Sequence, residues 1–245
     1  MSHRAIMNSG GACLAEVMIA MAAGLVVLAA TLQSLDHFER RLSKQHVAAA
    51  RAQDLRIGLK VLEDEVRAAG TASPPTGAPL TVAGRQEIEF EANLGGLVTT
   101  LTNSVSSVQQ DLPVISGTGW SKGKRILVCD RERCAEGRLA RDGHKALLSV
   151  TAPLEHDFAA GSEVRVVNRV RYYVKTERDG MARVMRAVDG GANPLIGEIT
   201  RFQLNYLDRD GAPTTHPSRV ARLRVEAAVG GEPVPVVQDI GLRGR

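Results

Sequence analysis

The chain has 245 residues, of which 44% are hydrophobic and only 3% aromatic, and its formal net charge is +4. This composition indicates one or two domains with an aliphatic core rather than a membrane protein of many helices, because only one segment is long enough to cross a bilayer. Basic residues alternate with Asp and Glu along the whole chain, so nucleic-acid binding is not indicated.

The first predicted element is an apolar run from Ala12 to Leu32 that contains a single charged residue, Glu16. A carboxylate within a membrane span is energetically unfavourable, so its presence there indicates a function. A secretory signal cleaved after Ala30 leaves Glu16 unexplained, and a lipoprotein reading at Cys13 fails because no apolar region precedes it. The remaining interpretation is cleavage before the run, with the run retained.

The residues around Glu16 carry a family resemblance. The segment Gly11–Ala20, GACLAEVMIA, resembles the prepilin cleavage and methylation motif of type IV pilins and pseudopilins. This resemblance implies that a prepilin peptidase cuts after Gly11, that Ala12 becomes the N-methylated N-terminus, and that Glu16 is the fifth mature residue. Ala12 departs from the family, which most often has Phe at that position.

The spacing between Ala12 and Glu16 has a physical interpretation of its own. A helix rises about 1.5 Å per residue, so Glu16 lies about one turn from the new N-terminus. If neighbouring helices are offset along their axes, the ammonium of one chain can neutralise the carboxylate of the next. Burying either charge alone would be costly, whereas the pair is tolerated. We therefore expect Glu16 to set the register of subunit assembly.

The apolar run is predicted to continue as one long helix over residues 12–69, with 12–32 spanning the membrane. The second half carries an amphipathic stripe at helical spacing, formed by Leu55, Leu59, Leu62, Val66 and Ala69. Gly58 is a weak point in this helix. A segment rich in Pro and Gly, residues 70–79, ends the helix and forms a linker. Residues 1–11, which precede the helix, are predicted to be a leader peptide.

Residues 80–245 are predicted to form a β-rich globular domain. Four Asp-Gly pairs, which favour tight hairpins, begin at Asp142, Asp179, Asp189 and Asp210, and Gly230-Gly231 is a further turn signal. Apolar and polar residues alternate in 202–206 and 222–227, as in antiparallel strands with one solvated face. The fold class is therefore α+β, with the amphipathic half of the helix packed on an antiparallel sheet.

Cys129 and Cys134 flank a short loop after a predicted strand. Four intervening residues in a hairpin can bring two Cα atoms to the roughly 5.5 Å that a disulfide needs, and a disulfide implies an oxidising compartment. A metal site with His144 and His156 is the second interpretation. Two reduced structural cysteines are the third, which a cytoplasmic location would favour.

The charges that flank the apolar run and the cysteine pair indicate opposite sides of the membrane for the C-terminal domain. The leader holds only Arg4, whereas Arg40, Arg41, Lys44 and Arg51 follow the span, which favours a cytoplasmic C-terminal domain. The disulfide candidate points to the periplasm instead. Long domains translocate largely regardless of charge, so we expect an inner-membrane protein with its C-terminal domain in the periplasm.

No catalytic or cofactor motif appears in the sequence. Hydrolase, metalloprotease and nucleotide-binding signatures are missing, and the six histidines are scattered. Asp208–Gly211 resembles part of a calcium loop, but a hairpin turn is the better interpretation. Trp120 could anchor a partner, although such a residue more often closes a core. We expect neither enzymatic activity nor a cofactor or metal.

Later segments sharpen the resemblance. Glu65–Gly70, Val170–Val174 and Ile199–Tyr206 are similar to segments of PilW-type minor pilins. The resemblance implies a low-abundance subunit that primes or caps a type IV pilus, with the prepilin peptidase, other pilins and inner-membrane lipid as partners. A J-type minor pseudopilin of type II secretion is the alternative within the superfamily. A membrane-anchored periplasmic binding domain is the alternative of another class.

Overall fold

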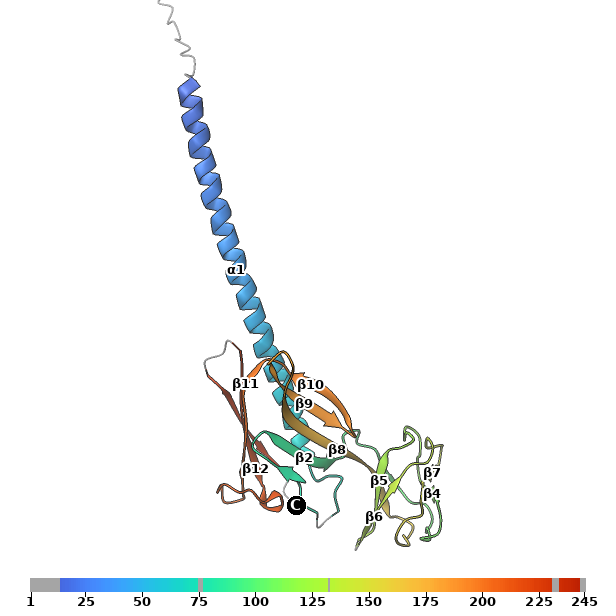
Figure 1. Ribbon diagram of the computed structural model, residues 1–245. Coiled ribbons are helices and arrows are strands. Elements are labelled where there is room, and N and C mark those ends of the chain that lie inside the picture. Colours follow the sequence, from blue (N-terminus) through green and yellow to red (C-terminus); the bar gives the residue numbers. More distant parts are fainter. Residues whose placement is uncertain (1–13, 75–76, 132, 231–233, 243–245) are drawn as a thin grey trace, which may run out of the picture. The chain divides into compact units, whose positions relative to one another are not determined.

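The computed structural model describes residues 14–74, 77–131, 133–230 and 234–242. Its first element is a single long helix, α1 (Leu14–Arg67), which is followed almost entirely by strands (Figure 1). The chain divides into two compact units, residues 1–50 and residues 51–245. The second contains all the strands and is called the β-rich unit below. The predicted α+β class, with a long N-terminal helix and antiparallel sheets, is confirmed.

The strands fall into three antiparallel sheets. The largest has eight strands: β1 (Val82–Ala83), β2 (Glu87–Ala92), β3 (Val98–Thr100), β5 (Arg125–Cys129), β6 (Cys134–Arg138), β8 (Glu163–Thr176), β9 (Ala182–Val188) and β10 (Gly191–Ile196). A second sheet contains β11 (Ile199–Leu207), β12 (Arg222–Val229) and β13 (Val236–Gly241). β4 (Asp111–Pro113) pairs with β7 (Leu147–Ser149), and a short 3-10 helix covers Pro217–Arg219.

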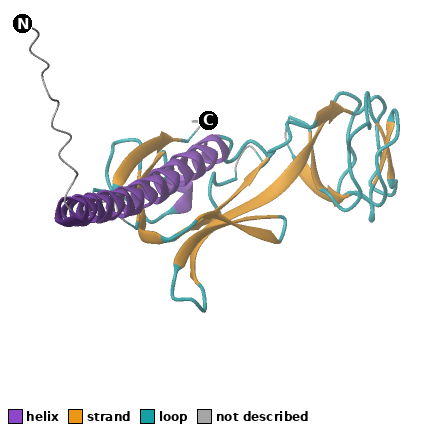
Figure 2. Cartoon of the chain, turned by 90° about the horizontal axis from the view of Figure 1, so that it is seen from above, coloured by secondary structure: helices purple, strands orange, loops and turns teal. Residues whose placement is uncertain are grey.

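Strand β8 connects two groups of strands. Its first part pairs with β3 and β5, with Val166 opposite Ile126, and its second part pairs with β2 and β9, with Val170 opposite Phe90. Figure 2 shows β8 running without a break from one group to the other. Antiparallel pairing of this kind is what alternating, half-buried strands predict.

The residues after Ala50 contain two main hydrophobic cores. One core joins the end of α1 to β2, β8, β9 and the β11–β12–β13 sheet, and includes Leu59, Phe90 and Leu223. The other is built from β4 to β7, the start of β8 and the loops next to them, includes Trp120 and Phe158, and contains no residue of α1. The prediction of one sheet with one face for the helix is therefore incomplete, because half of β8 serves a core of its own.

The amphipathic stripe on α1 forms the centre of the first core. Leu55, Leu59, Leu62 and Val66 are at most 2% exposed, as their helical spacing predicts. Burial of each such side chain stabilises the fold by about 1.5–3 kcal/mol. This part of α1 is therefore an integral element of the β-rich unit.

The helix ends where glycine allows a change of backbone direction. Ala68 and Ala69 bond to carbonyls three residues earlier, which tightens the last turn. Gly70 has a φ of +79° and donates its N–H to the carbonyl of Glu91 on β2 at 2.9 Å. Arg165 donates to the carbonyl of Thr71 at 2.7 Å, so the segment after the helix is bound to the sheet.

The Asp-Gly pairs lie where the chain turns. Asp179-Gly180 connects β8 to β9 and Asp189-Gly190 connects β9 to β10, and the glycine of each pair has a positive φ. Asp189 itself has a φ of 51°, which suits a two-residue hairpin turn. Asp210-Gly211 lies between β11 and β12, and Asp142-Gly143 between β6 and β7.

Candidate functional site

The first part of α1 is an apolar helix whose side chains are uncovered. From residue 16 to residue 50 every described side chain is exposed. The large apolar ones in the first five turns are Leu14, Val17, Met18, Ile19, Met21, Leu25, Val26, Val27, Leu28 and Leu32. An apolar surface on all sides of a helix requires lipid or other helices around it.

The length of α1 suits a membrane span. An 18-residue window of this helix reaches a mean hydropathy of 2.0, and no residue of that window is buried. About 20 residues cross the hydrocarbon core of a bilayer, so α1, with 54 residues, is long enough to cross it. The chain thus contains a helix long and apolar enough to anchor it in a membrane.

Glu16 lies in the first turn of α1 and is exposed. It forms no ion pair with the described residues, and the next charged residue in the sequence is Asp36, more than five turns away. No cation on the helix itself can therefore neutralise Glu16 within the apolar run. Gly11 and Ala12, the predicted cleavage and methylation positions, lie outside the described residues.

The predicted cysteine pair is joined at a hairpin. Cys129 ends β5, Cys134 begins β6, and a disulfide links them across a Cα–Cα distance of 4.1 Å. The backbone N–H of Arg133 donates to the Asp130 carboxylate at 2.8 Å and closes the loop. Cys129 packs with Ala72, Leu127 and Val167, so the disulfide lies beside the segment that follows α1.

The other candidates from the sequence have structural roles or no common site. The Sγ atoms of Cys129 and Cys134 are bonded to each other, and the described residues hold no group of three His, Cys, Asp or Glu side chains arranged to bind a metal. Trp120 is 3% exposed and belongs to the second core. Asp208 accepts hydrogen bonds from the backbone of Asp210 and Ala212, as a hairpin turn requires.

Sequence reasoning missed two carboxylates that fix α1 in the fold. Glu65 pairs with Arg186 on β9 and accepts a hydrogen bond from the Tyr172 hydroxyl on β8. Glu63, two positions earlier, accepts a hydrogen bond from Gln238 on β13 at 2.8 Å. Residues two apart lie on nearly opposite sides of a helix, so each carboxylate binds a different sheet.

These contacts shift the pKa values of two of the groups that make them. Burial, reinforced by the Glu65 carboxylate, raises the pKa of Tyr172 well above its ordinary value. The hydrogen bond to Glu65 raises the pKa of Arg186, against the opposing effect of burial. The positions of Glu63 and Glu65, between the stripe residues Leu62 and Val66, are the one sequence signal for these contacts. Their partners could not be identified, because they lie more than 100 residues away.

The comparisons with known proteins return no match among protein-family models, curated proteins or solved structures. The architecture itself, one long apolar N-terminal helix with antiparallel sheets, is compatible with a pilin-like protein.

Proposed function

We propose that this chain is a minor structural subunit of a type IV pilus, processed by a prepilin peptidase and incorporated to prime or cap the filament. One observation carries the proposal: α1 exposes an apolar surface that holds a single acidic residue in its first turn, and the same helix ends inside a folded core. In this role the protein is a substrate of the peptidase rather than an enzyme.

The proposed assembly step is electrostatic. Cleavage after Gly11 creates an ammonium at Ala12, and Glu16 of a neighbouring helix offers the carboxylate that neutralises it. Both groups then move together from the inner-membrane lipid into a bundle of apolar helices formed with other pilins. Neutralisation in pairs supports this transfer because a lone buried charge is destabilising by several kcal/mol.

The proposed location of the β-rich unit is the periplasm and then the pilus. The Cys129–Cys134 disulfide supports this location because disulfides persist in oxidising compartments. The exposed stripe formed by Leu35, Phe38 and Leu42 supports helix packing beyond the lipid, because it continues the apolar surface at helical spacing.

The mature N-terminus tests the proposal. Intact-mass and N-terminal analysis of the chain expressed with a prepilin peptidase should show a start at Ala12. A start at Met1 would make the protein a membrane-anchored periplasmic domain, and a start at Thr31 would make it a secreted protein. The leader offers matched variants, since Gly11→Leu should abolish the cut while Gly10→Leu leaves it in place.

A further inference from the structure

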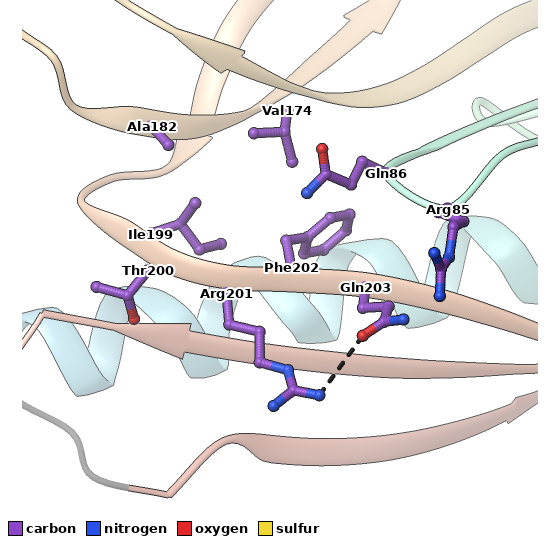
Figure 3. A pocket seen from close by; sticks show the side chains of 9 residues that line it. All are labelled: Arg85, Gln86, Val174, Ala182, Ile199, Thr200, Arg201, Phe202 and Gln203. Carbon is purple, nitrogen blue, oxygen red and sulfur yellow. Dashed lines mark hydrogen bonds between the residues drawn. The ribbon is translucent and has the colours of Figure 1, made fainter.

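Two of the cavities in the β-rich unit are large enough for a ligand. The one drawn in Figure 3, of about 570 Å³, is a groove between β8 and β11 whose lining includes Val174 and Phe202. Phe202 is 3% exposed and belongs to the first core, and Arg201, which also lines the groove, pairs with Glu226 at 2.8 Å. This groove is therefore part of the packing between two sheets, whereas the second cavity offers free charged groups to a ligand.

The second cavity, which we call the post-helix cavity, has a volume of about 890 Å³. It lies where the segment that follows α1 meets the connection between β11 and β12. Its volume falls within the roughly 300–1,000 Å³ of ligand pockets. Ala69, Val220 and Leu242 form an apolar part of its lining, and each of them is at most 9% exposed. The apolar body of a small organic molecule would be shielded from water against these side chains.

The charged residues of the post-helix cavity are three arginines and two aspartates, so its lining carries a net charge of +1. Asp208 accepts hydrogen bonds from the backbone N–H groups of Asp210 and Ala212, so its carboxylate already serves its own turn. Arg209 and Arg219 are exposed and form no ion pair with the residues that the structure describes. Two guanidinium groups at the border of the cavity are therefore available to an anion.

The third arginine, Arg165 on β8, is fixed at the wall of the post-helix cavity. Its Nη1 donates to the carbonyl of Thr71 at 2.7 Å, and Thr71 lines the same cavity. Its buried Nε lies 3.2 Å from Oε1 of Glu163 but forms no hydrogen bond. Among the described residues, none accepts a hydrogen bond from Nη2. Arg165 is thus held in place with an unused donor, and hydrogen bonds from a charged donor to a carboxylate are about twice as strong as neutral ones.

We propose that the post-helix cavity binds a small organic carboxylate, with the carboxylate bonded to the arginines and the apolar body against Ala69, Val220 and Leu242. A single negative charge matches the net charge of the lining, whereas a doubly charged phosphate would leave one charge uncompensated. The site does not depend on filament assembly, because every residue that lines it belongs to the β-rich unit. A mature chain that starts at Ala12 but binds no carboxylate would contradict this proposal alone.

A photoreactive phenylpropanoate tests this site. Its ring carries a trifluoromethyl diazirine, which gives a fluorine NMR signal and crosslinks to neighbouring residues under illumination, and the neutral amide of the same compound is the control. Both are titrated against the full chain in lipid nanodiscs, with empty nanodiscs as the blank. We expect saturable binding of the carboxylate, about tenfold weaker binding of the amide because the charge-assisted hydrogen bonds are lost, and crosslinks in peptides from residues 69–79 or 208–221.

Charge reversals make the test specific. Arg209→Glu combined with Arg219→Glu should weaken binding of the carboxylate by about tenfold or more, because two attractions become repulsions. Both arginines are exposed, so the fold should tolerate the change. Arg178→Glu reverses an exposed arginine between β8 and β9, outside the cavity, and should change binding by less than about twofold. Absence of saturable binding, equal affinity for carboxylate and amide, equal weakening by the control variant, or crosslinks only in other peptides would each overturn the proposal.

Discussion

The carboxylate of Glu65, near the end of α1, accepts a hydrogen bond from the hydroxyl of Tyr172, which lies 107 residues later on β8. Tyr172 is fully buried, and Arg186 on β9 completes the charge pair. The three side chains come from a helix and two neighbouring strands, so they bind the end of α1 to the largest sheet. Removing one member should loosen this attachment.

Tyr172→Phe should lower the free energy of unfolding by about 1.5–3 kcal/mol, because a hydrogen bond to a charged group is lost in a buried place. Arg186→Met should be at least as damaging, since Glu65 then lacks its cation. Arg178→Met, at an exposed position between β8 and β9, is the control and should change little. Denaturant unfolding in micelles measures all three. Equal stability of Tyr172→Phe and the wild type would contradict this role of the hydroxyl.

Stability should fall in alkaline solution through the buried tyrosines. Burial and Glu65 raise the pKa of Tyr172, and burial and Glu87 raise the pKa of Tyr206. A raised pKa in the folded state gives stability that is complete below the unfolded pKa of about 10 and is lost as the pH rises above it. Each tyrosine contributes up to ~1.4 kcal/mol per pH unit to this loss.

Tyrosine variants isolate this effect. Unfolding free energies from pH 8 to 11 should decline less steeply for Tyr172→Phe than for the wild type, and least for Tyr172→Phe combined with Tyr206→Phe. Tyr173→Phe is the matched control because Tyr173 is only partly buried on the same strand. If the free energy of unfolding declines with pH at the same rate in all four proteins, the tyrosines have the same protonation in the folded and the unfolded state.

Gly58→Ala should destabilise the protein although alanine favours helix. A Cβ at this position would lie 2.3 Å from Cγ1 of Ile196 on β10. Overpacking costs about 1–3 kcal/mol, which exceeds the gain in helix propensity of about 1 kcal/mol over most of that range. Gly24→Ala is the control, because nothing lies within 4 Å of an added Cβ there.

A second substitution tests the contact directly. Ile196→Ala removes the clashing atom, so the double variant should lose less stability than the sum of the two single variants. Additive losses in thermal or denaturant unfolding would mean that the helix does not approach β10 as closely as the structure indicates.

Glu16→Ala should leave the precursor cleavable but reduce incorporation by about tenfold or more, because the N-terminal amine of a neighbour then lacks a carboxylate. Gln33→Ala, at another exposed polar position of α1, should incorporate normally. Immunoblots of sheared filaments and of membranes give the ratio of assembled to unassembled subunit. Normal incorporation of Glu16→Ala would rule out the pairing mechanism.

The three cysteines should differ in reactivity. Alkylation of the denatured, unreduced protein should modify Cys13 alone, and reduction should make Cys129 and Cys134 reactive as well. Cys129→Ala combined with Cys134→Ala should lower the free energy of unfolding by about 2 kcal/mol, as expected for a short closed loop. Labelling of all three cysteines before reduction would contradict the disulfide and the oxidising compartment.

Local sequence patterns predicted much of the fold. The apolar run and the stripe from Leu55 to Val66 predicted one long helix, because helical spacing alone decides which side chains share a face. The pairs Asp179-Gly180 and Asp189-Gly190 predicted hairpins because their backbone conformations are set locally. The short separation of Cys129 and Cys134 made their pairing predictable for the same reason.

Among the candidate functional residues, too, some could be identified from the sequence and others could not. Glu16 is distinguished by its apolar neighbours in sequence, so composition was enough to identify it. The groove lined by Val174 on β8 and Phe202 on β11 was not predictable, because two strands of different sheets are brought together only by long-range packing. A period-2 pattern shows which residues share a face of a strand, but it does not show which other strands lie beside it.

The sequence by itself therefore determined the long helix with a lone carboxylate in its apolar run, the antiparallel class and the hairpin spacing of the two cysteines, all of which depend on residues close together in the chain. Only the tertiary structure decided that β8 serves two separate cores, that Glu63 and Glu65 bind α1 to different sheets, and that Gly58 admits Ile196. The physical reason is distance along the chain: each of these contacts joins elements that local propensity treats independently and that only packing of the whole β-rich unit brings together.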